Sequence, residues 1–150
     1  MFDTFFGLPL HPLAVHAAAV LPLLAAAWSA ATALLPRLGR RACAAGAVLA
    51  VATLASVFVA DRSGREFATR LGNPSAAADH IALGKLTIWY ALAFAVCAVG
   101  LWAVRVYEDR ISLRGGVVVV RALTLLAAAA LVVHAVRVGH SGATAVWGSV

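Results

Sequence analysis

Long uncharged apolar runs dominate the chain, and the short segments between them carry nearly all of its charges. Residues 4–36, 42–60 and 86–104 contain no Asp, Glu, Lys or Arg. A hydrocarbon core of about 30 Å needs roughly 20 residues of helix, so each run is long enough to cross a membrane. Residues 115–136 form a fourth run that only Arg121 interrupts, close enough to one end for its guanidinium to reach the headgroups.

These runs predict an all-α fold, an integral membrane four-helix bundle that forms a single domain over residues 1–150. We expect transmembrane helices near 10–35, 42–60, 77–105 and 116–138. Gly139, Gly142 and Gly148 follow the last run. They predict that the fourth helix ends near Gly139 and that residues 139–150 form an interfacial tail, which folds His140 back over the mouth of the bundle.

Composition and charge support a membrane protein and predict its orientation. Hydrophobic residues make up 63% of the chain and charged residues 12%, with a net charge of +6. The arginines flank helix ends, which is typical of topology determinants and anionic-lipid contacts, and nucleic acid is not implied. The first link carries Arg37, Arg40 and Arg41 without an acid. Positive-inside counting then predicts both termini on the outer side of the bacterial cytoplasmic (inner) membrane.

Histidines gather at one end of the predicted bundle although its helices alternate in direction. His11 and His16 open the first helix, His80 opens the third, and His134 and His140 lie near the end of the fourth. Imidazoles at similar depth on different helices can hold a haem iron from both faces. We therefore predict a haem b site with His16 and either His80 or His134 as ligands, and with His11 and His140 as supporting or alternative ligands.

Neighbouring residues fit such a site. Gly84 and Thr87 share a helix face with His80, so a planar macrocycle could approach the backbone there. Arg65 and Arg137 could pair with haem propionates, although an ion pair with Asp61 one turn earlier is the simpler role for Arg65.

Zinc or copper is the alternative cofactor at this end. His16, His80 and His134 would be its ligands, and Asp61 and Asp79 could complete the site. However, no His-x-x-x-His spacing places two ligands on one helix, because the five-residue step from His11 to His16 turns them about 140° apart.

The predicted function is an outward-facing haem- or metal-binding membrane module, acting in electron transfer or as a subunit of a redox or respiratory assembly. Its partners would be the lipid bilayer, other membrane subunits and a redox partner on the outer side. The chain has no nucleophile elbow, phosphate loop or zinc-protease motif, so we do not expect a stand-alone enzyme.

Two other functions stay open. The first alternative is a non-catalytic structural or interaction subunit of a larger membrane complex, in which Ala42, Gly46 and Ala50, at four-residue spacing, let another membrane protein pack closely. The second alternative is a proton or solute pathway. A pathway is disfavoured because the inner halves of the spans carry almost no polar side chains to continue it.

Three segments, "GLPLHPLAVH", "DHIALGKL" and "GHSGATAVWG", resemble a family of small bacterial four-helix membrane proteins of unknown function. They are similar to that family's Leu-His-Pro-x-x-Val-His opening, its His-Ala-x-x-Asn segment and its Gly-His-x-Gly-Gly-x-x-Val-Tyr ending. The resemblance implies a four-helix bundle with a shared site on the outer side, and marks His11, His16, His80, His140 and Asp61. The chain departs from the family pattern at Ala17 and Ala18 (Phe-Pro in the family), Gly84 (Asn) and Trp147 (Tyr).

Overall fold

Four long helices form the molecule. The computed structural model describes residues 4–35, 37–107 and 114–148. The elements in chain order are β1 (Thr4–Phe5), β2 (Leu8–Pro9), α1 (Leu10–Leu34), α2 (Arg40–Arg70), the 3₁₀ turn η1 (Ser75–Ala77), α3 (Ala78–Tyr107) and α4 (Arg114–Trp147). All four helices are long and apolar enough to cross a membrane, which confirms the predicted multi-pass helical architecture.

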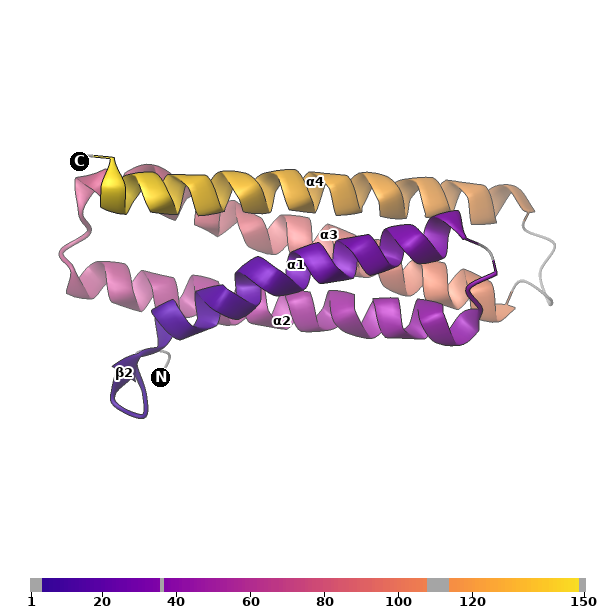
Figure 1. Ribbon diagram of the computed structural model, residues 1–150, viewed down its shortest axis with the longest axis horizontal. Coiled ribbons are helices and arrows are strands. Elements are labelled where there is room, and N and C mark those ends of the chain that lie inside the picture. Colours follow the sequence, from indigo (N-terminus) through magenta and orange to yellow (C-terminus); the bar gives the residue numbers. More distant parts are fainter. Residues whose placement is uncertain (1–3, 36, 108–113, 149–150) are drawn as a thin grey trace.

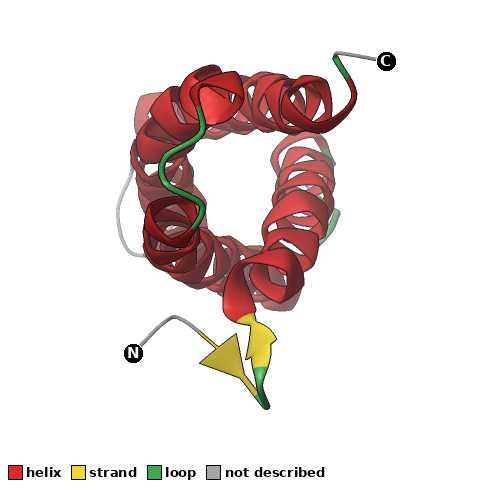
Figure 2. Cartoon of the chain, turned by 90° about the vertical axis from the view of Figure 1, so that its left-hand side faces the viewer, coloured by secondary structure: helices red, strands yellow, loops and turns green. Residues whose placement is uncertain are grey.

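The helices form a ring in chain order. Each helix packs against the next, α4 closes the ring against α1, and α1 and α3 lie on a diagonal (Figures 1 and 2). At one end of the ring α1 and α3 begin and α2 and α4 end (left in Figure 1). All five histidines lie at this end, as predicted, and we call it the histidine end.

Two helices are longer than predicted. Helix α2 continues through ten residues beyond residue 60, and α4 continues through Gly139 and Gly142 to Trp147. The predicted interfacial tail is therefore wrong for the described residues. A glycine inside a helix costs about 1 kcal/mol relative to alanine. Packing offsets this cost at Gly142, which lies directly against the His80 ring of α3.

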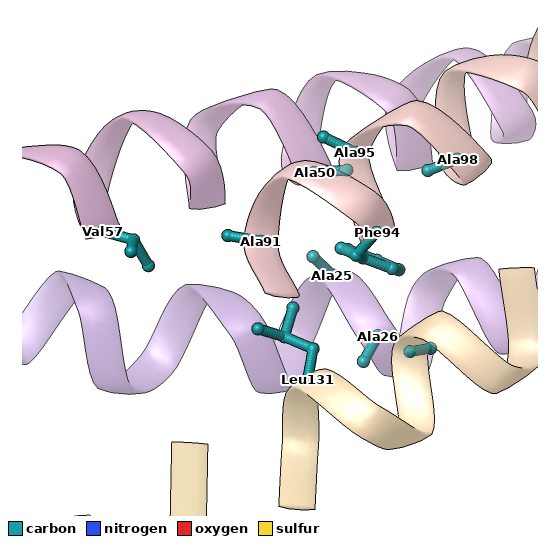
Figure 3. Close-up of a cluster of buried hydrophobic side chains, with 10 residues drawn as sticks. Ala25, Ala26, Ala50, Val57, Ala91, Phe94, Ala95, Ala98 and Leu131 are labelled. Carbon is teal, nitrogen blue, oxygen red and sulfur yellow. The ribbon is translucent and has the colours of Figure 1, made fainter. Parts of the chain in front are cut away.

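Small side chains form most of the core (Figure 3). Fully buried Phe94 and Leu131 lie among alanines from all four helices. Lipid tails are as apolar as these side chains, so close van der Waals packing rather than the hydrophobic effect holds such helices together. Alanines allow this because they bring the backbones close.

The small residues Ala42, Gly46 and Ala50 of α2 pack inside the bundle. A Cβ on Gly46 would lie 3.2 Å from Trp28 of α1, and the Trp28 indole N–H donates to the Ala42 carbonyl at 2.9 Å. Ala50 is completely buried. Ala42 and Gly46 contact α1 and Ala50 is buried in the core, so the prediction that these three residues form a surface for another membrane protein is wrong.

A short hairpin precedes the bundle. Thr4 pairs with Pro9 and Phe5 with Leu8. The intervening Phe6 and Gly7 have φ of 50° and 81°, the left-handed pair that a two-residue hairpin turn requires. The hairpin leads directly into α1 and so brings His11 to the second position of that helix.

Candidate functional site

A cavity of about 200 Å³ lies at the histidine end, and residues of all four helices line it. Its wall is mostly apolar, and small residues make the space: Ala18, Ala19, Ala60, Gly64, Gly84, Ala135 and Gly139. The polar lining residues are His11, Asp61, Arg65, His80, Lys85 and Thr87. Gly84 and Thr87, which the sequence predicts on the same helix face as His80, thus both line the cavity.

His11 is held by α2. Its Nδ1 lies 3.1 Å from the Ala60 carbonyl oxygen and 3.4 Å from the Ser63 hydroxyl. The Ser63 hydroxyl itself donates to the Val59 carbonyl at 2.8 Å. A carbonyl only accepts, so the His11 Nδ1 carries the proton and donates it to Ala60.

His80 is held by α4 in the same way. Its Nδ1 lies 3.1 Å from the Val138 carbonyl oxygen and 3.3 Å from the Ser141 hydroxyl. Ser141 in turn donates to the Val138 carbonyl at 2.9 Å. The His80 Nδ1 therefore also carries a proton.

This protonation determines what the two rings can offer. A neutral imidazole with its proton on Nδ1 has a lone pair on Nε2. Neither Nε2 has a hydrogen bond to any of the residues that the structure describes. His11 and His80 thus bring two oriented Lewis bases to one cavity, from helices on the diagonal of the ring.

Charged groups lie at the rim of the cavity. Asp61, whose side chain is only 10% exposed, accepts from the Arg65 guanidinium in a bidentate ion pair with a shortest contact of 2.9 Å. This confirms the predicted i, i+4 pair. Lys85 is exposed, and no ion pair joins it to another described residue. Since Arg65 and Lys85 are both exposed lining residues, the cavity reaches the surface of the bundle.

His134 has a different role from the two cavity histidines. It is buried on α4, its Nε2 lies 3.1 Å from the Leu83 carbonyl and 3.2 Å from the Thr87 hydroxyl, and its ring stacks on Tyr90. The carbonyl accepts, so Nε2 is a donor and is not available as a ligand in this state. His134 joins α4 to α3 next to the cavity without lining it.

The structure does not bring the other predicted site residues to the cavity. His16 is exposed, and its Nδ1 lies 2.7 Å from the Pro12 carbonyl of its own helix. His140 and Arg137 are exposed on α4. None of the three lines the cavity. The two histidines that line the cavity are therefore His11 and His80, whereas His16 and His134 do not line it.

A metal site built only from protein ligands has no support in the described residues. Among them, no three His, Cys, Asp or Glu side chains are grouped closely enough to hold a metal ion. Asp79, one of the predicted extra ligands, is exposed and does not line the cavity.

Four residues outside the predicted site pack against the two histidine rings: Ser63, Gly64, Ser141 and Gly142. A signal for them exists, because Ser-Gly occurs only twice in the chain, and both times near the end of a helix.

Comparisons of the chain with models of known protein families, with curated proteins and with solved structures find no match. The function therefore has to be argued from the membrane-spanning four-helix fold and from the geometry of the cavity.

Proposed function

We propose that the protein is a haem-binding electron-transfer module of the membrane, in which His11 and His80 would hold the haem iron. The observation that supports this most is the pair of imidazoles on diagonal helices, each of which donates Nδ1–H to a backbone carbonyl and leaves its Nε2 lone pair free. Haem-ligating and metal-ligating histidines characteristically make this second hydrogen bond, which orients the ring and raises its basicity. Bound haem would supply one-electron exchange between ferric and ferrous iron.

The number of ligands favours haem over a bare metal ion. A haem iron already has four porphyrin nitrogens and needs only two protein ligands. Zinc sites take three or four protein ligands, and the described residues around the cavity do not supply them. Copper or zinc remains the alternative that the experiment below distinguishes.

The cavity also suits the two chemical parts of a haem. Apolar lining from Val15, Val57 and Ile81 suits a porphyrin ring, and Lys85 and Arg65 at the rim could pair with its carboxylates. A haem is larger than a cavity of about 200 Å³, so part of it would have to lie outside the cavity, whose rim carries these two cations. Arg137 is not part of this arrangement.

The proposal includes an orientation. Exposed Arg37 lies between α1 and α2, and exposed Arg40 and Arg41 open α2, at the end opposite the histidines. Positive-inside counting places this end in the cytoplasm and the histidine end on the outer side of a bacterial inner membrane. The haem would then exchange electrons with an outer-side partner or with another subunit of a redox assembly.

An absorption spectrum of the gently purified protein, first oxidised and then reduced with dithionite, tests the proposal. We expect a sharp Soret band and resolved α and β bands on reduction. His11→Ala and His80→Ala should each lose these bands and still fold, whereas His16→Ala, the matched control, should keep them. Unchanged bands in His11→Ala and His80→Ala would refute the ligand assignment.

Elemental analysis of the same sample separates the other possibilities. A colourless protein with stoichiometric zinc or copper would replace haem by metal chemistry. A colourless protein without metal that co-purifies with another membrane protein would favour the structural subunit.

A further inference from the structure

The two cavity histidines lie in repeated surroundings. His11 at the start of α1 packs against the end of α2, and His80 at the start of α3 packs against the end of α4. Each helical hairpin therefore supplies one ring and the backbone that holds it.

The repeat extends to individual residues of the second helix of each hairpin. In α2 the accepting carbonyl belongs to Ala60, and Ser63 and Gly64 follow three and four residues later. In α4 it belongs to Val138, and Ser141 and Gly142 follow at the same two spacings. These spacings place all three on one helix face, toward the ring.

The glycines leave the space that the rings fill. A Cβ on Gly64 would lie 2.9 Å from Cε1 and 3.1 Å from Nδ1 of His11. A Cβ on Gly142 would lie 3.1 Å from the same two atoms of His80. All four distances are shorter than the 3.5–4.0 Å of ordinary carbon contacts, so any side chain there would displace the ring.

The His11 ring has little freedom to move aside. Its Nδ1–H is bound to the Ala60 carbonyl, and the Phe67 ring is stacked against it with centroids 5.9 Å apart. Moving away from a new methyl group would stretch this hydrogen bond and turn Nε2 away from its present direction.

Two other glycines of the cavity lack this property. Gly84 and Gly139 also line it, yet a Cβ on either would meet nothing within 4 Å. Of these four glycines, only Gly64 and Gly142 are packed closely against a histidine ring.

We propose that Gly64 and Gly142 are positioning residues of two equivalent half-sites, each fixing the direction of one imidazole. The role of the two glycines in holding a haem rests on the proposed function, but their positioning of the imidazole rings is a property of the protein alone. The iron of a bound haem would then receive one similarly held imidazole from each helical hairpin.

A double-mutant cycle tests the positioning without a cofactor. Gly64→Ala should lower the Tm of the protein in detergent by several degrees, and the same substitution should have no such effect in a His11→Ala background. Gly142→Ala should behave likewise with His80→Ala. Gly84→Ala and Gly139→Ala are the matched controls and should leave the Tm unchanged or raise it, because glycine to alanine favours a helix.

Added haem tests the link to function. Haem affinity should fall about 10- to 100-fold in Gly64→Ala and Gly142→Ala, as for other changes that disturb ligand orientation. The electron paramagnetic resonance g values of the haem that remains should also change, which a purely structural loss would not cause.

The two proposals can fail separately. Coupling in the cycle without haem binding in the wild type would overturn the proposed function and support the positioning. Haem binding with Gly64→Ala and Gly142→Ala indistinguishable from the wild type, in both Tm and g values, would overturn the positioning.

Discussion

His134 should be needed for the stability of the bundle and not for haem binding. The residue is 3% exposed, and its ring joins α4 to α3 through the Leu83 carbonyl and the Tyr90 ring. In His134→Ala the Leu83 carbonyl would keep the Thr87 hydroxyl, which donates to it at 3.3 Å. No polar group would then be left unpaired, and the loss would be limited to the contacts of the ring itself.

These contacts give the expected magnitude. A hydrogen bond between transmembrane helices contributes about 0.6 kcal/mol, a stacked ring pair about 1 kcal/mol, and the void left by the imidazole costs about 1 kcal/mol more. We therefore expect His134→Ala to lower the free energy of unfolding by about 2 to 3 kcal/mol. Tyr90→Leu, which removes only the stacking, should lower it by about 1 kcal/mol.

Unfolding in mixed micelles with increasing SDS, followed by tryptophan fluorescence, measures this difference. The reduced absorption spectrum of the folded fraction measures haem content in the same sample. A His134→Ala variant as stable as the wild type would refute the interhelical role. A stable, folded His134→Ala variant without haem would return His134 to the ligands.

Three further changes test other parts of the structure. Phe94→Ala empties a completely buried position and should lower the free energy of unfolding by about 3 to 5 kcal/mol in the SDS assay; a loss below 1 kcal/mol would contradict the packing of the core. Gly46→Val should lower it by about 1 to 3 kcal/mol and shift tryptophan emission, because the new side chain meets Trp28; an unchanged emission maximum would argue against this contact. If haem binds as proposed, Asp61→Asn should raise its reduction potential, because the Asp61 carboxylate at the cavity would stabilise the more positive ferric state; a potentiometric titration checks the sign, and a lowered potential would contradict it.

The four long apolar helices could be predicted because nearly all charges lie outside the apolar runs, and only Arg121 interrupts one of them. The ends of α2 and α4 could not be predicted in the same way. Residues 61–70 look like a polar loop by composition, yet in α2 the charges of Asp61 and Arg65 pair along one helix face. Gly139 and Gly142 look like a helix end, but α4 packs against α3 there, and tertiary contacts override the low helix propensity of glycine.

The location of the site at one bundle end followed from the sequence, but the choice of histidine did not. Successive residues of a helix are rotated by about 100°, so the choice between His11 and His16 depends on the rotation of α1 about its axis. That rotation is determined by packing against α2, where the Ala60 carbonyl accepts a hydrogen bond from His11 and Gly64 leaves room for its ring. Such contacts join residues about fifty positions apart, and no local pattern around His11 contains them.

The two Ser-Gly pairs are a sequence pattern that could have indicated which histidines face the cavity. Each pair lies near the end of a hairpin's second helix, and the histidine that it faces lies near the start of the first. Ser supplies an oxygen beside Nδ1 and Gly supplies room for the ring, so the pair makes sense only together with its histidine. The pattern that predicts the site therefore extends over a helical hairpin rather than a single helix. Because the chain contains two such hairpins, each with one imidazole, it places a histidine on two diagonal helices of the same cavity.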